Sequence, residues 1–197
     1  MKPYFLTHPI GLLYLFVLLV WYFMELRQIA LQQQWRQDAT TVGPRSFRPV
    51  TGACIVATIV VLSVAPHVAR GAAIGHDALV FAIGMGILVA GVALRLWSFR
   101  ALGQYFTFTL KVSPDQPVVT RGPYRVLRHP GYAGALLAIV GISVLHGNWI
   151  GGEIVSLLWL ALIVWRIHVE ENALLTTLGG RYRTYAARHK RLVPLVW

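Results

Sequence analysis

The sequence predicts an all-α, polytopic membrane protein with about five transmembrane helices. Of its 197 residues, 56% are hydrophobic and only 13% are charged, whereas soluble domains average about 45–50% apolar and about 25% charged residues. Long apolar runs recur along the chain, and strand signals are weak throughout. One cysteine, Cys54, excludes an internal disulfide and a cysteine-based zinc site.

Five apolar stretches are predicted to cross the membrane, which takes about 20 apolar residues each. The first three runs approach that length, while the last two, at 133–145 and 154–165, require flanking residues to complete the crossing. Gly147-Asn148 between these two suits a tight helical hairpin. No small-residue cleavage site closes the first run, so we interpret it as a retained helix and not a signal peptide. The predicted spans are 9–26, 50–68, 78–97, 132–146 and 150–168.

The basic residues support this number of spans. The formal net charge is +11, from 18 Lys and Arg against 7 Asp and Glu. Only Lys2 and Arg70 fall in the segments assigned to the external side of the membrane, and Arg95 and Arg166 stand at span ends. By the positive-inside rule the N-terminus is external and the C-terminus cytoplasmic. The other fourteen cations fall in the three segments assigned to one side: Arg27, Arg36, Arg45, Arg48, Arg100, Lys111, Arg121, Arg125, Arg128, Arg181, Arg183, Arg188, Lys190 and Arg191.

The segments between and after the spans complete a single membrane-embedded domain, 1–197. Residues 26–36 are predicted to extend the first span as a polar helix. Residues 98–131 contain four prolines and are expected to be mostly irregular with short helices. Residues 170–190 contain good helix formers with a break at Gly179-Gly180.

Two superficial motifs are set aside. Gly84, Gly86 and Gly91 lie inside a span, so they indicate close helix packing and not a dinucleotide loop. The seven histidines are scattered without an H-x-x-x-H pair, so no metal site is expected. Because membrane topology accounts for the basic residues, no nucleic-acid partner is expected either.

Two other features of the sequence contain candidate catalytic or binding residues. Residues 118–132 are dense in glycine, proline, aromatic and basic residues, and they lead directly into a span. A basic loop at the membrane surface explains the arginines, but not His129-Pro130-Gly131-Tyr132 at the membrane entrance. Arg166 and Glu170 share one helix face at the end of the fifth span. They are either an ion pair that shields both charges or a functional pair, since ionisable groups at membrane depth usually mark function.

Together these features resemble the isoprenylcysteine carboxyl methyltransferase family of integral-membrane enzymes. The resemblance runs from about residue 97 to residue 194 and leaves the first two spans without diagnostic residues. It implies a cytoplasmic cofactor loop and a C-terminal helix. It also implies that S-adenosylmethionine binds on the cytoplasmic side, in a pocket made by the last two spans and the C-terminal segment, without the Rossmann-like methyltransferase fold. The matching residues are Leu102-Gly103 with Phe106, Gly122-Pro123-Tyr124, Arg128 to Tyr132 with Gly134, Arg166 with Glu170-Glu171, Gly179 to Tyr182 with Tyr185, and Pro194.

The resemblance also implies roles for individual residues. Arg166 would bind the substrate, and Arg166 and Glu170 together are the expected catalytic residues. The other expected contacts to S-adenosylmethionine, besides Glu170, are Gln116, Pro117, Val118, Val119, Tyr124, His129, Pro130, Gly131 and Tyr132.

The chemistry of Arg166 favours an anionic methyl acceptor. A carboxylate is already ionised at neutral pH and needs only positioning and removal of water. An amine must lose a proton, and a neighbouring arginine would repel its charge. We therefore expect a lipophilic acceptor that enters from the bilayer, preferably the carboxylate of an isoprenylcysteine-like substrate. The alternatives are a phospholipid-amine or small-thiol methyltransferase, a sterol-type reductase that binds a nicotinamide cofactor, and a non-catalytic scaffold that binds anionic lipids. The expected location is a prokaryotic inner membrane.

Overall fold

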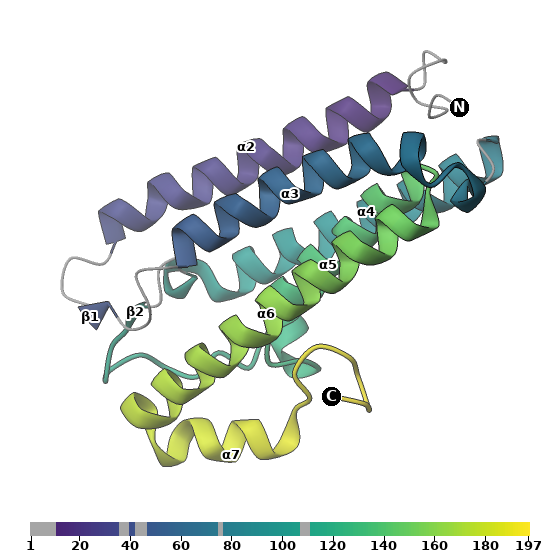
Figure 1. Cartoon of the computed structure of the whole chain (residues 1–197). Coiled ribbons are helices and arrows are strands. Elements are labelled where there is room, and N and C mark those ends of the chain that lie inside the picture. Colours follow the sequence, from purple (N-terminus) through teal and green to yellow (C-terminus); the bar gives the residue numbers. More distant parts are fainter. Residues whose placement is uncertain (1–10, 36–39, 42–46, 75–76, 107–110) are drawn as a thin grey trace.

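The fold is a bundle of long helices with a shorter helix folded beneath one end (Figure 1). The structure, a computed structural model, describes residues 11–35, 40–41, 47–74, 77–106 and 111–197. The elements are α2 (Gly11–Trp35), β1 (Thr40–Thr41), α3 (Phe47–Val68), the 3-10 turn η1 (Arg70–Ala72), α4 (Ala78–Leu102), η2 (Gly103–Tyr105), β2 (Lys111–Val112), η3 (Gly122–Arg125), α5 (Pro130–Leu145), α6 (Trp149–Leu178) and α7 (Gly180–Arg188).

The all-α fold class is confirmed, and five apolar helices occur in the predicted order. By length and composition α2, α3, α4 and α6 are able to cross a membrane. The fifth, α5, is apolar but has only 16 residues, which is about 24 Å of helix. The first two residues of the predicted span 9–26 lie outside the described residues. The antiparallel pair of two-residue strands β1 and β2 is the only sheet among the described residues.

Helices α4 and α5 pack closely because glycines line their crossing. A Cβ added to Gly91 would lie 2.4 Å from the backbone nitrogen of Ala138, and one added to Gly134 would lie 2.7 Å from that of Arg95. Only a residue without a side chain allows such an approach. The prediction of close helix packing at Gly91 is therefore confirmed, whereas a Cβ at Gly86 would meet nothing within 4 Å.

The connection between α5 and α6 is the tight hairpin that the sequence predicts. Gly147 adopts a positive φ of 68°, and the Asn148 side chain caps α6 by accepting a hydrogen bond from the Gly151 backbone N–H at 2.9 Å. The amide group of Asn148 also donates to the Ala69 carbonyl at 2.9 Å. This hairpin is therefore tied to the end of α3.

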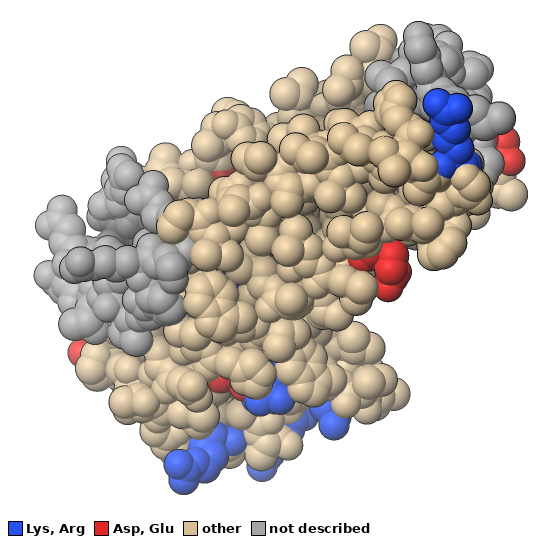
Figure 2. Space-filling view, viewed as in Figure 1, with Lys and Arg blue, Asp and Glu red and all other residues tan. Residues whose placement is uncertain are grey.

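Helix α6 continues ten residues beyond the predicted span end at 168, and its C-terminal half contains the predicted catalytic residues Arg166 and Glu170. It ends at Leu178, the next residue Gly179 has a φ of +56°, and α7 begins at Gly180, so the predicted break is confirmed. In Figure 1, α7 folds back beneath α6. Basic residues gather around this end of the molecule, while the middle of the visible face carries almost no charge (Figure 2).

Candidate functional site

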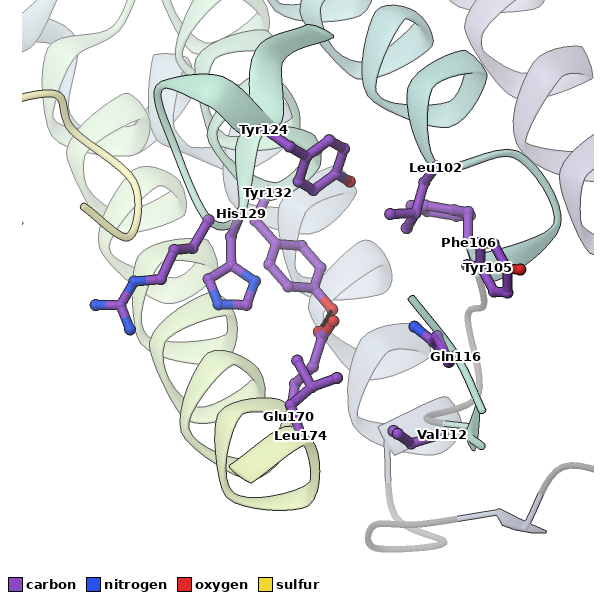
Figure 3. A pocket seen from close by; sticks show the side chains of 12 residues that line it. Leu102, Tyr105, Phe106, Val112, Gln116, Tyr124, His129, Tyr132, Glu170 and Leu174 are labelled. Carbon is purple, nitrogen blue, oxygen red and sulfur yellow. Dashed lines mark hydrogen bonds between the residues drawn. The ribbon is translucent and has the colours of Figure 1, made fainter. Parts of the chain in front are cut away.

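A cavity opens where α5 and α6 meet the loop that follows α4 (Figure 3). Its tyrosines Tyr124 and Tyr132 lie on one side, and Leu102 and Phe106 lie opposite. The wall thus combines aromatic rings with one carboxylate, from Glu170. The lining residues are Leu102, Tyr105, Phe106, Val112, Gln116, Tyr124, Arg128, His129, Gly131, Tyr132, Glu170 and Leu174.

The hydroxyl of Tyr132 joins the two residues predicted to be catalytic. Arg166 Nε donates a hydrogen bond to this hydroxyl at 2.7 Å, and the hydroxyl donates to Glu170 Oε2 at 2.6 Å. Arg166 and Glu170 come from successive turns of α6, and Tyr132 comes from the first turn of α5. The sequence predicted the shared face of the two charged residues but not the tyrosine between them.

The guanidinium of Arg166 lies behind Tyr132 and not among the residues that line the cavity. Its Cζ atom is 5.6 Å from the centroid of the Tyr132 ring and 5.3 Å from that of Phe47. These distances are within the range of cation–π attraction. Two aromatic faces and one hydroxyl therefore fix the position of the guanidinium.

Glu171 holds a second charged cluster, and two of its members, Arg128 and His129, line the cavity. Its carboxylate is buried, forms an ion pair with Arg128 Nη1 at 2.7 Å and accepts a hydrogen bond from Arg191 Nε at 2.9 Å. His129 Nε2 lies 3.2 Å from the same carboxylate. A buried carboxylate is stable only when it is paired and hydrogen-bonded. Glu171 thus fastens the segment before α5 and the segment after α7 to α6.

Arg95 of α4 fixes the floor of the cavity. Its Nη1 donates to the carbonyl of Gly131 at 2.9 Å, and its Cζ lies 5.9 Å from the centroid of the Phe106 ring. Glu25 of α2 forms an ion pair with Arg95. The first span, which carries no diagnostic sequence, is thereby connected to the site.

Helix α7 holds the turn η3 that presents Tyr124. The hydroxyl of Tyr185 donates to the carbonyls of Tyr124 and Leu127 at 2.8 and 3.2 Å. Burial, followed by the nearby charge of Glu170, raises the pKa of the Tyr124 hydroxyl above its ordinary value. Tyr124 is therefore a neutral phenol at physiological pH and offers the cavity an aromatic ring and a hydroxyl, not a phenolate.

The predicted cofactor residues divide into two groups. Gln116, Tyr124, His129, Gly131, Tyr132 and Glu170 line the cavity, while Pro117, Val118, Val119 and Pro130 do not. Val118 packs instead on the apolar cluster of Tyr182 and Tyr185. Pro117 is exposed and Pro130 is buried at the start of α5.

Comparison with known proteins places the chain in a family. The sequence profile of the phospholipid methyltransferase family matches residues 79–181, just over half of the chain. The chain belongs to the phospholipid methyltransferase family. This match covers α4, the cavity loop, α5 and α6, and so includes every predicted site residue.

Named relatives support the resemblance to isoprenylcysteine carboxyl methyltransferases, which is confirmed. Protein-S-isoprenylcysteine O-methyltransferase B of Arabidopsis thaliana is 33% identical over 120 residues, 57% of this chain and 58% of that one. The enzyme of Schizosaccharomyces pombe is 31% identical over 57% of this chain and 48% of its own. An uncharacterised Bacillus subtilis protein, YpbQ, is 30% identical over 47% of this chain and 55% of its own. The chain thus spans about half to three-fifths of the length of these relatives.

The fold of this phospholipid methyltransferase family member is also found in a solved structure. The eukaryotic intramembrane Ras methyltransferase, isoprenylcysteine carboxyl methyltransferase, superposes with a TM-score of 0.64 over 79% of this chain and 55% of that one, at 23% identity. Together with the four helices of spanning length, this fold makes the chain an integral membrane protein.

Several lining residues were not predicted as site residues. Leu102, Phe106 and Arg128 lie in segments that carry the family resemblance, so the signal for them was present in the sequence. Tyr105, Val112 and Leu174 belong to no motif that the sequence analysis identified. They reach the cavity because η2, β2 and α6 converge there.

Proposed function

We propose that this protein transfers a methyl group from S-adenosylmethionine to a lipophilic acceptor, preferably the carboxylate of an isoprenylcysteine-like substrate. The observation that carries the proposal is the hydrogen-bonded chain from Arg166 through Tyr132 to Glu170 beside the aromatic cavity. The named activities of the relatives supply the reaction class.

The residues of the cavity fit a sulfonium cofactor. When bound, S-adenosylmethionine supplies an electrophilic methyl group on a positively charged sulfur. Aromatic faces and a carboxylate both attract such a cation, and this wall offers Tyr124, Tyr132, Phe106 and Glu170. Polar groups from Gln116 and His129 complete the wall and are suited to bind the polar parts of the cofactor.

Arg166 is the residue we assign to the acceptor. A guanidinium matches the geometry of a carboxylate and remains charged at all physiological pH values. The substrate carboxylate requires no general base because it is ionised at neutral pH. The task of the chain is therefore to orient the acceptor oxygen and exclude water from it. Tyr132 and Glu170 serve this task by holding the guanidinium.

The orientation of the protein is part of the proposal. The basic residues at the α7 end favour a cytoplasmic active site and C-terminus, with an external N-terminus. The membrane we propose is a prokaryotic inner membrane, and the similarity to a Bacillus subtilis protein supports this choice. The acceptor would enter from the bilayer, because the cavity lies between helices of an apolar bundle.

The test is methyl transfer by site variants reconstituted in vesicles. Arg166→Ala and Glu170→Ala are expected to abolish transfer of radiolabelled methyl groups to a prenylated cysteine analogue, while thermal unfolding remains close to that of the unchanged protein. Glu153→Ala, at an exposed position in the first turns of α6, is the matched control and should retain full transfer. Wild-type rates in both site variants would refute the assignment.

A phospholipid-amine methyltransferase is the second candidate, because the matching profile is named for that activity. The two candidates give different products, either a methyl ester that base hydrolyses or a stable N-methyl headgroup. Incubation with both acceptors and base treatment of the product separates them. Only a base-labile product supports the carboxylate acceptor.

A further inference from the structure

The residues after α7 fold back toward the bundle as a compact apolar hairpin, residues 192–197. Leu192 and Trp197 pack in a cluster with Ile163 and Ile167 of α6, and Leu136 of α5 joins the same cluster. Figure 1 shows this last segment beneath α5 and α6. The hairpin therefore packs in an apolar cluster with residues of two of the membrane helices.

The attachment point lies just inside the predicted edge of the membrane spans. Ile163 lies five residues before the predicted span end at 168, which is about 8 Å along the helix axis. Leu136 lies four residues after the predicted span start at 132, about 6 Å along α5. A segment packed at this level lies beside the apolar stretches that the spans bury in lipid.

The backbone of the hairpin satisfies most of its own hydrogen-bond donors. The N–H groups of Leu192 and Val193 donate to the carbonyl of Trp197 at 2.8 and 2.9 Å, and those of Val196 and Trp197 donate to the carbonyl of Val193 at 3.2 Å. Pro194 has no N–H group. Internal pairing of this kind is what a segment in contact with hydrocarbon requires, because lipid supplies no acceptors.

The tip of the hairpin displays apolar side chains outward. Leu195 is 92% exposed, Val196 is 72% exposed and Val193 is 50% exposed. Leu195 also has a φ of 67° in the turn closed by the Val196-to-Val193 hydrogen bond, a position that favours glycine. In water, this leucine would combine backbone strain with full exposure of an apolar side chain.

We propose that residues 192–197 are a membrane anchor whose tip, Val193 to Val196, inserts among the lipids of the leaflet that adjoins α7. Lys190 comes shortly before the hairpin and is exposed, where its charge would meet anionic headgroups. An apolar tip next to basic residues is the pattern of interfacial anchors. The partner is therefore the lipid bilayer itself.

The anchor is connected directly to the cavity wall. The backbone N–H groups of Arg128 and His129 donate to the carbonyls of Lys190 and Arg191 at 2.8 and 3.0 Å. Insertion of the tip would fix the depth of residues 190–191 relative to the membrane surface. Through these two hydrogen bonds the bilayer would also stabilise the position of His129 in the cavity wall.

The test places a probe at the tip of the anchor. In a Cys54→Ala background, which removes the single cysteine of the sequence, Leu195→Cys is labelled with an environment-sensitive fluorophore. The matched control is Thr184→Cys, an exposed position of α7 on the same face as Arg181 and Arg188. Both proteins are reconstituted in vesicles of phosphatidylcholine and phosphatidylglycerol, with and without a nitroxide on the acyl chains.

We expect the probe at residue 195 to emit at shorter wavelength than the probe at 184 and to lose more than half of its intensity to acyl-chain nitroxides. The probe at 184 should lose little. Equal quenching at the two positions would overturn the proposal. A shielded probe at 195 that nitroxide lipids leave unquenched would also overturn it, because a protein partner would then cover the tip. The readout does not depend on methyl transfer and is independent of the proposed function.

Discussion

Replacement of Tyr132 by phenylalanine tests the bridge between the two charged residues of the site. The change removes one hydroxyl and keeps the aromatic ring that lines the cavity. That hydroxyl accepts from Arg166 at 2.7 Å and donates to Glu170 at 2.6 Å. Each bond has a charged partner, and such bonds contribute about 1.5–3 kcal/mol.

The expected loss follows from these values. After the substitution, Arg166 and Glu170 move toward each other or bind water, so the net loss is about that of one charge-assisted bond. At about 1.4 kcal/mol for each factor of ten, methyl transfer should fall about 10- to 150-fold. Because the ring remains, affinity for the methyl donor should change less than kcat with the lipophilic acceptor.

The assay is methyl transfer in vesicles at varied concentrations of donor and acceptor. Tyr182→Phe is the matched control, because the Tyr182 hydroxyl is buried without a hydrogen-bond partner within the described part of the chain. This control should keep full activity and equal or greater thermal stability. If Tyr132→Phe transferred methyl groups at the wild-type rate with unchanged affinity for both substrates, the bridge would have no part in the reaction.

Three further substitutions test the scaffold that holds the site. Gly91→Ala should lower the unfolding temperature markedly, because the added Cβ would lie 2.4 Å from a backbone nitrogen of α5. The control Gly86→Ala adds a Cβ in open space and should leave the unfolding temperature unchanged. Equal stability of the two variants would contradict the packing of α4 on α5. Glu171→Ala removes the buried carboxylate that pairs the partly buried Arg128 and Arg191, and should cost about 3–5 kcal/mol of stability in denaturant unfolding. A loss below 1 kcal/mol would refute its role. Arg95→Lys should weaken donor binding in calorimetric titration, because a lysine lacks the planar fork of donors that reaches Gly131 and both carboxylate oxygens of Glu25. Wild-type affinity would argue against a role for Arg95 in the cavity floor.

The fold could be predicted largely from local properties of the sequence. Apolar length located the helices, Gly147-Asn148 located the hairpin and Gly179-Gly180 located the break before α7. The predicted span 150–168 ends where hydropathy falls, and the helix predicted from residue 170 to the break at Gly179-Gly180 joins it in one continuous helix, α6. A span and a helix are different quantities, and only the first follows from hydropathy.

The site could be predicted only where its residues stand close together in the sequence. Arg166 and Glu170 share a helix face, so their spacing was informative. The connection of Glu25 to Arg95 and the cluster around Glu171 join residues far apart in the chain. Side-chain pairing across 20 to 70 positions leaves no periodic signal in one sequence. Val118, which the family resemblance assigns to the cofactor, packs on the apolar cluster that contains Tyr182 and Tyr185, and its contact with the cofactor stays a prediction.

The measurement that tests the central claim most directly is the chemical identity of the methylated product. The purified protein in vesicles is supplied with radiolabelled S-adenosylmethionine and equal amounts of a prenylated cysteine analogue and an aminophospholipid. Our account predicts a labelled methyl ester on the prenylated acceptor, with the label released as volatile methanol in base. A base-stable label on the phospholipid amine, or no transfer to either acceptor, would contradict it.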